Sequence, residues 1–446
     1  MKTSFLDRVA AAVTPLAVKF SNQRHLASVR DGFIALMPLV IVGSIMVLIN
    51  NVLLSNTQGG IWGPGSPLEG LADLTAFKEI GVRIYTGTLD IMGLLIVYTI
   101  SYKLSATYGE DGFIPGLVAV GSFIAMIPLT QAIILSPEQL ASGTLDVANL
   151  NTVYLSAVGM FVAIAVSLIA TEILLRLSRI KALIIKMPES VPPAVARSFN
   201  IMVPTLITLG IFAIVAFLLN YFWQTDIFTL INLAIKTPVQ ALFQGLPGIF
   251  LVMFLQNFLW AFGIHGAFIL SPITEPTLLE ALTANATAIS QGLPALNIVT
   301  KPFIDAFVLI GGGGTTIGLL IALFIFSKRE DHKAIAKLAA APGLFNINEP
   351  LMFGLPVVLN PIYMIPVVIA PLVNLCIAYF ATLIGLVEKT YVMTPWTTPP
   401  VISAFLATGG DWKAAVLAVL LIGVATLIYI PFVIIGNKVD QTVEAE

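Results

Sequence analysis

Charged residues are scarce in this sequence, and the two signs nearly balance. Asp, Glu, Lys and Arg make up 10% of the 446 residues, and the formal net charge is −2. Soluble domains carry about 25% charged residues, so the composition argues against a soluble globular protein. The chain also lacks the basic surface that would indicate binding of nucleic acid.

Cysteine and histidine are nearly absent as well. The single cysteine, Cys376, stands in an apolar run, so no intramolecular disulfide can form, and the setting favours a small buried hydrophobic residue over a reactive thiol. No two histidines or cysteines have metal-ligand spacing, and neither an ATP-binding motif nor a nucleophile elbow occurs. We therefore expect no metal and no cofactor, and we expect energy to come from an ion gradient or another protein.

Apolar residues dominate the chain. They form 58% of it, with a mean hydropathy of +0.97. Several apolar stretches exceed the roughly 20 residues that cross a hydrocarbon core about 30 Å thick. The short alternating segments of a membrane β-barrel are absent. No cleaved signal peptide is evident, and apolar residues at helical spacing over residues 5–20 predict an amphipathic helix on the membrane surface. The predicted fold class is an all-α polytopic membrane protein.

The first half of the chain follows the rule that basic residues mark cytoplasmic loops. Residues 1–30 hold five Lys and Arg residues, and residues 176–197 form the densest basic loop, so both are predicted to lie inside the cell. Five spans alternate consistently with these loops, at about 32–54, 83–104, 113–135, 152–175 and 200–222. A connecting or interfacial helix is predicted over residues 226–243.

The second half is less regular. Apolar runs occur at about 248–270, 303–327, 359–387 and 412–436, and polar or glycine- and proline-rich pieces interrupt them. The basic stretch 328–337 should also lie inside, which requires a re-entrant hairpin or an additional crossing between residues 271 and 302. A second hairpin around residues 342–355 leaves the sidedness unchanged, so both termini are predicted to be cytoplasmic. We expect residues 1–225 to form a scaffold, 226–247 an amphipathic connection and 248–446 a binding half.

Glu349 is the most informative residue, because it carries an acidic group between two strongly apolar stretches. Placing such a group at the centre of a bilayer costs about 2.5–3.5 kcal/mol on insertion scales. Neighbouring Asn, Pro and Gly residues predict broken backbone that lines a polar cavity. The amides of Asn346 and Asn348 and the carboxylate would together suit the hydroxyls of a sugar. A helix cap or a buried ion pair is the alternative.

Three further residues are candidates for ligand contact. His265 lies in the segment Trp260–Gly266, where it either contacts a ligand or bonds to a backbone carbonyl. Trp396 is either an interfacial anchor or a ring that stacks on a sugar face. Asn257 could face either way. The glycine cluster Gly311–Gly314 is not a P-loop, and close packing is favoured over contact with a ligand.

These residues resemble a known family, the enzyme IIC component of the bacterial phosphoenolpyruvate-dependent sugar phosphotransferase system, in its lactose/cellobiose/diacetylchitobiose branch. The resemblance covers essentially the full length. The glycine cluster departs from the pattern, because many relatives are expected to have a serine within it. The segments that carry the resemblance are Val29–Phe33, Gly263–Gly266, Lys301–Phe303, Gly311–Gly314 and Phe345–Pro350.

The resemblance implies about ten transmembrane helices, two re-entrant hairpins and amphipathic interfacial helices. It further implies a homodimer formed through the N-terminal half, and a C-terminal half that binds one sugar and moves through the bacterial inner membrane as a unit. A separate IIB subunit, served by IIA, would deliver phosphate from a phosphocysteine. Substrate-binding roles carry over to His265 and Glu349, and less directly to Asn348 and Trp396. The chain itself would carry no phosphorylated residue, although Glu349 could polarise the sugar hydroxyl.

Other functions fit parts of the pattern. An ion-coupled secondary sugar transporter would use Glu349 to carry a proton, and it would release free sugar inside the cell. An intramembrane enzyme acting alone is disfavoured, because no catalytic pair is visible. The sugar itself is not identified by the residues. A β-linked disaccharide such as cellobiose or diacetylchitobiose is what the resemblance implies.

Overall fold

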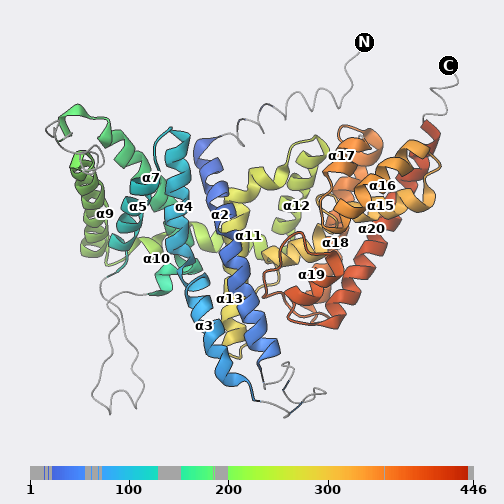
Figure 1. Ribbon diagram of the computed structural model, residues 1–446, viewed down its shortest axis with the longest axis horizontal. Coiled ribbons are helices and arrows are strands. Elements are labelled where there is room, and N and C mark those ends of the chain that lie inside the picture. Colours follow the sequence, from blue (N-terminus) through green and yellow to red (C-terminus); the bar gives the residue numbers. More distant parts are fainter. Residues whose placement is uncertain are drawn as a thin grey trace. The chain divides into compact units, whose positions relative to one another are not determined.

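The structure is a computed structural model that describes residues 23–55, 73–128, 152–183, 199–355 and 357–439, with the isolated residues 15, 19, 62, 69 and 185. Every regular element in these ranges is a helix (Figure 1). The predicted surface helix over residues 5–20 lies almost entirely outside them. Within the described ranges, six helices are long and apolar enough to cross a membrane, and a bent helix pair adds a seventh candidate. The all-α polytopic fold class is therefore confirmed.

A side-chain cap marks the start of some of the helices. Asp226 precedes α10 (Ile227–Ile231), and its carboxylate accepts the N–H of Thr229 at 2.9 Å. Asn360 precedes α18 (Pro361–Leu383), and its side chain accepts the N–H of Ile362 at 2.9 Å. Each cap satisfies a backbone donor that the first helical turn leaves unpaired.

The described residues form two compact units. The N-terminal unit contains residues 24–38 and 86–238, and the C-terminal unit contains residues 39–85 and 239–446. Helix α2 (Arg24–Leu48) and its π-helical extension η1 (Ile49–Leu53) cross from the first unit into the second. The functional division into a scaffold and a binding half stays a prediction.

The N-terminal unit is built on regular apolar helices: α4 (Met92–Thr107), α5 (Phe113–Ala125), α7 (Met160–Ser178) and α9 (Met202–Trp223). Helices α4 and α7 pack closely, and the Ser101 and Thr171 hydroxyls hydrogen-bond at 2.6 Å between them. These helices match four of the five predicted spans. The fifth predicted span, at about 32–54, corresponds to α2 and η1, and the predicted end of the span at 113–135 lies beyond residue 128, outside the described residues.

The C-terminal unit contains more breaks. Its elements after the connecting segment are α11 (Thr237–Gln244), α12 (Leu246–Ala261), α13 (Gly266–Ser290), α14 (Lys301–Phe303), η8 (Ile304–Val308), α15 (Thr316–Phe326), α16 (Glu330–Leu344), α17 (Glu349–Gly354), α18, α19 (Pro400–Ala407) and α20 (Trp412–Val439). The chain is helical from Ile227 to Gln244 and bends by 85° into α12.

Two predicted apolar runs prove to be broken. The run at about 248–270 ends as a helix at Ala261, and α13 then continues for 25 residues through a stretch that the polar sequence indicated to be broken. The run at about 303–327 is split by the π-helix η8 and by a turn at Gly311–Gly314. Apolar composition indicated where these segments lie in the sequence, but not the position of the backbone breaks.

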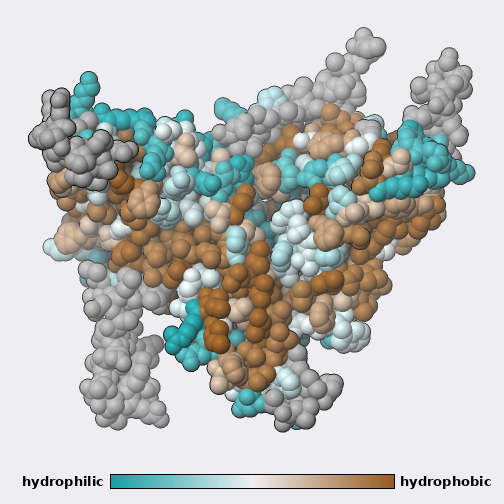
Figure 2. Space-filling model, viewed as in Figure 1, coloured by the Kyte–Doolittle hydropathy of each residue, from teal (hydrophilic) through white to brown (hydrophobic). Residues whose placement is uncertain are grey.

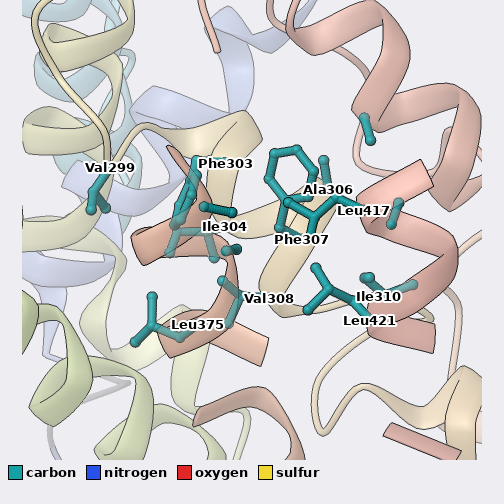
Figure 3. Packing of buried hydrophobic residues seen from close by; sticks show 14 of the residues in the cluster. Val299, Phe303, Ile304, Ala306, Phe307, Val308, Ile310, Leu375, Leu417 and Leu421 are labelled. Carbon is teal, nitrogen blue, oxygen red and sulfur yellow. The ribbon is translucent and has the colours of Figure 1, made fainter. Parts of the chain in front are cut away.

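A packed core surrounds the π-helix η8. Phe303, Ile304 and Phe307 lie against Leu375 of α18 and Leu417 of α20, all of them buried (Figure 3). In a membrane such close packing, rather than transfer out of water, stabilises helix association. Hydrophilic residues gather over α16 in this unit, whereas apolar residues follow α20 (Figure 2). This rigid core holds the turn that follows η8.

Candidate functional site

His265 stands at the break between α12 and α13. The turn is made by Gly263, whose φ of 77° is left-handed, and a Cβ added at Gly266 would lie 2.2 Å from the carbonyl oxygen of Gln256. Only glycine allows the two helices to approach this closely. The half-buried His265 ring stacks on Phe268 at a centroid distance of 3.9 Å. Its Nδ1 is buried and has no hydrogen-bond partner among the described residues.

Trp260 lies beside this histidine. The indole is 6% exposed, and its ring centroid is 4.7 Å from that of His265 in an edge arrangement. It also meets the exposed ring of Phe353 at 6.1 Å. The indole Nε1–H is buried without a hydrogen-bond partner in the described part of the chain. Buried Trp N–H groups are normally paired, so this donor is an exception and a candidate for pairing with a ligand.

Glu349 is the first residue of α17 and lies within electrostatic reach of His265. It forms no salt bridge within the described ranges, so the ion-pair alternative is not observed. Its side chain is exposed, whereas the sequence suggested an enclosed position. Exposure leaves both carboxylate oxygens accessible as hydrogen-bond acceptors.

The glycine turn Gly311–Gly314 is bonded to the side chains of three asparagines, Asn257, Asn346 and Asn348. Gly311, Gly312 and Gly314 have left-handed φ values of 81°, 96° and 85°. A Cβ at Gly312 would lie 2.7 Å from the carbonyl oxygen of Asn346. The turn therefore requires glycine both for its conformation and for the close approach of the 346–350 segment.

All three predicted asparagines bond to the backbone of this turn. The Asn346 side-chain oxygen accepts the Gly311 N–H at 2.7 Å, and that of Asn257 accepts the Gly314 N–H at 2.8 Å. The Asn348 amide donates to the Gly313 carbonyl at 2.6 Å. The structure thus brings these three residues together at the turn, and their predicted role in sugar binding stays a prediction.

One backbone donor of the turn is left over. The Gly313 N–H has no hydrogen-bond partner among the described residues, although its own carbonyl and the flanking amides are bonded. A Cβ added at Gly313 would lie 2.9 Å from Trp260 Cδ1 and 3.1 Å from Nε1. Two unpaired N–H donors therefore lie close together, next to the unpaired His265 ring nitrogen.

Trp396 joins the site through its backbone. The Asn346 amide donates to the Trp396 carbonyl at 2.6 Å, while the indole is 50% exposed. Lys301 and Asp305 form an ion pair at 2.9 Å, and Glu275 lies 3.9 Å from the same ammonium group. Among the described residues no cluster of His, Cys, Asp or Glu could hold a metal ion.

Sequence reasoning missed Phe268 and Phe353, and for Trp260 and the glycine cluster that contains Gly313 it favoured packing over contact with a ligand. The sequence leaves two roles open for Trp260, packing and stacking on a sugar, because nothing local shows that its N–H lacks a partner. Its place five residues before a histidine flanked by glycine was the one available signal. The arrangement as a whole offers donors, acceptors and exposed rings at three helix breaks, which is the composition of a site for a polar, ring-shaped ligand.

Comparison with known proteins gives a consistent result. The sequence matches the family described as "Phosphotransferase system, EIIC" over residues 30–371. It is 32% identical to the cellobiose-specific EIIC component of Lactococcus lactis subsp. lactis (strain IL1403), covering 96% of this chain and 97% of that protein. It is also 32% identical to the lichenan permease IIC component of Bacillus subtilis (strain 168), over 96% and 92% of the two chains.

A solved structure agrees with the fold. The crystal structure of ChbC, the IIC component of an N,N'-diacetylchitobiose-specific phosphotransferase system, superposes with a TM-score of 0.87 at 31% sequence identity. The match covers 97% of this chain and 98% of the other. The similarity therefore extends over both compact units.

Proposed function

Because the chain belongs to the EIIC family of the phosphotransferase system, a family of membrane-embedded sugar permeases that work with a phosphorylating IIB subunit, we propose that it transports a β-linked disaccharide such as cellobiose or diacetylchitobiose. The sugar is bound at the helix breaks of the C-terminal unit and presents its 6-hydroxyl to the phosphocysteine of a separate IIB protein. The membrane is the bacterial inner membrane, with both termini in the cytoplasm.

One observation carries the binding site. Trp260 Nε1–H, Gly313 N–H and His265 Nδ1 are unpaired groups of a single neighbourhood, and Glu349 adds an unpaired carboxylate. Sugar hydroxyls both donate and accept hydrogen bonds, so they match this mixture of groups. Exposed rings of Phe268 and Trp396 provide apolar surface for a pyranose face.

The choice of a β-linked disaccharide rests on the relatives. Two are named for cellobiose and lichenan, a third for oligo-β-mannoside, and the matching crystal structure for diacetylchitobiose. All of these names refer to β-linked saccharides. The residues of the site do not by themselves distinguish among them.

Charge supports a cytoplasmic docking face for IIB. The stretch 328–337 has four basic and two acidic side chains. Hydrogen bonds from Arg329 lower the pKa of Asp331 to about 2, so this pair is fully ionised and neutral overall at physiological pH. Lys333 pairs with Glu330 at 3.2 Å. Lys328 and Lys337 form no ion pair within the described ranges and remain to attract an acidic partner.

The organisation of the C-terminal unit supports movement of the site as one body. Its binding residues, the glycine turn and the η8 core belong to the same compact unit. Elevator-type movement would therefore carry the assembled site without rebuilding it. In the N-terminal unit few residues of α9 are buried, which leaves an apolar face for lipid or for a second copy in a homodimer.

Reconstituted vesicles test the proposal. The protein would be assayed with labelled cellobiose and diacetylchitobiose, the soluble phosphotransferase proteins and phosphoenolpyruvate, with monosaccharides for comparison. We expect uptake that requires phosphoenolpyruvate and yields sugar phosphate, and that Glu349→Gln abolishes. The matched control is Glu388→Gln, at an exposed glutamate in the loop after α18. Free sugar inside the vesicles, with uptake stopped by a proton uncoupler, would instead establish the ion-coupled transporter.

A further inference from the structure

Both donor hydrogens of the Asn346 amide are taken up by bonds within the protein, and its oxygen is already bonded to the glycine turn. Its side-chain oxygen accepts the Gly311 N–H at 2.7 Å, and its amide donates to the carbonyls of Trp396 at 2.6 Å and Thr398 at 3.0 Å. An Asn amide has two donor hydrogens, and both are occupied. The residue is 8% exposed. The side chain therefore cannot donate to a sugar unless one of these bonds breaks, and its burial limits approach to the remaining lone pair of the oxygen.

Asn346 joins two segments that are distant from it and from each other in the sequence. Gly311 belongs to the glycine turn, whereas Trp396 and Thr398 belong to the irregular segment 394–400, which also contains a tight turn closed by the Thr398 N–H on the Pro395 carbonyl at 2.8 Å. Both carbonyls converge on one amide. The backbone of Asn346 itself is left-handed, with φ of 62°, a conformation that Asn tolerates better than most residues.

We infer that Asn346 is a positioning residue, which fixes the Trp396 segment to the glycine turn and so sets the place of the Trp396 ring in the sugar site. The inference rests on the proposed function. It changes the role predicted for this residue from sugar contact to action through Trp396. Asn348 differs, because its amide bonds the Gly313 carbonyl and none of its hydrogen bonds reach the Trp396 segment.

A double-mutant cycle tests this role. Sugar affinity would be measured by calorimetry on the purified full-length protein for wild type, Asn346→Asp, Trp396→Ala and the double variant. Asn346→Asp keeps the acceptor for Gly311 and replaces the two donors with an oxygen that faces two carbonyls. We expect it to weaken binding about tenfold or more when Trp396 is present. In the Trp396→Ala background we expect a loss of less than about twofold, because the ring through which it acts is gone.

Asn348→Asp is the matched control. It also removes one amide bond to the glycine turn, so any loss it causes should be the same with and without Trp396. Hydrogen exchange provides a second readout: peptides covering 394–400 should exchange faster in Asn346→Asp, and peptides from the middle of α18 should not. If Asn346→Asp fails to fold, Asn346→Ser takes its place in the same cycle.

Equal losses from Asn346→Asp in both backgrounds, with unchanged exchange over 394–400, would overturn the inference while leaving a sugar-binding protein. Failure of the wild type to bind any sugar of the panel would overturn the proposed function, and the inference with it. Strong coupling of Asn346, but not Asn348, to Trp396 would establish the positioning role.

Discussion

Adding one methyl group at Gly313 is the sharpest perturbation that the structure offers. The new Cβ would lie 2.9 Å from Trp260 Cδ1 and 3.1 Å from Nε1, closer than real Cβ contacts allow, so the indole must shift by a few tenths of an ångström. The φ of Gly313 is not left-handed, unlike that of Gly311, Gly312 and Gly314. Gly313→Ala therefore changes the spacing of the two unpaired donors without straining the backbone.

The size of the effect follows from those donors. A hydrogen bond contributes about 0.5–1.5 kcal/mol net, so misplacing two of them costs about 1–3 kcal/mol of binding. That corresponds to about a 5- to 150-fold loss of sugar affinity. Overpacking of this kind lowers stability by about 1–3 kcal/mol, so the protein should still fold.

Two other glycines serve as controls. Gly311→Ala would place its Cβ 2.4 Å from the Ile317 backbone nitrogen at a left-handed φ, and we expect it to prevent folding of the turn. Gly423→Ala in α20 meets nothing within 4 Å and should be neutral or stabilising, because alanine favours helix. Calorimetry with cellobiose and thermal unfolding would be measured on all three. Wild-type affinity in folded Gly313→Ala would refute the assignment of the donors.

Trp260→Phe keeps an aromatic ring but removes the Nε1–H, so calorimetry should show about a 2- to 10-fold loss of sugar affinity. The smaller ring leaves a cavity in a buried position, so the melting temperature should also fall. Unchanged affinity would show that this N–H binds nothing. Lys301→Met leaves the largely buried carboxylates of Glu275 and Asp305 without their cation, so chemical unfolding should show a loss of stability of about 3–5 kcal/mol. In the same assay the control Arg83→Met, at an exposed ion pair, should cost about 1 kcal/mol or less. Replacing Lys328 and Lys337 by Glu should slow sugar phosphorylation by IIB, most strongly at low salt, without changing sugar affinity; an equal effect at all salt concentrations would argue against electrostatic docking.

The regular helices of the N-terminal unit could be predicted from hydropathy alone. Their apolar side chains cover whole spans, and basic loops separate them, so length and charge give both position and order. Helix α13 could not be predicted in this way. Its polar residues make the sequence look like a broken loop, but several are paired internally: Asn285 accepts the backbone N–H groups of Leu296 and Asn297 at 3.0 and 2.8 Å. Hydropathy does not register a polar group that is satisfied within the protein.

The candidate site likewise contains residues that could be predicted from the sequence and residues whose roles could not. His265 and Glu349 could be selected from sequence, because a histidine between glycines and a carboxylate between apolar runs are each unusual on their own. The roles of the asparagines could not, since the backbone groups they bind are 35 to 57 residues away in the chain. Which amide is free and which is bonded is a tertiary property, and residue type alone does not carry it.

The glycine turn shows why the two interpretations of Gly311–Gly314 were not real alternatives. Close packing of the turn requires residues with left-handed φ and the approach of Asn346 and Asn348. In this packed arrangement the carbonyl of each of the four glycines accepts a hydrogen bond, and the donors include the hydroxyls of Thr316 and Tyr429 and the amide of Asn348. Among the N–H groups of the four glycines, that of Gly313 alone has no partner within the described residues. A turn that packs tightly thus presents a single fixed donor, held in place before the sugar arrives, and such preorganisation lowers the ordering cost of binding.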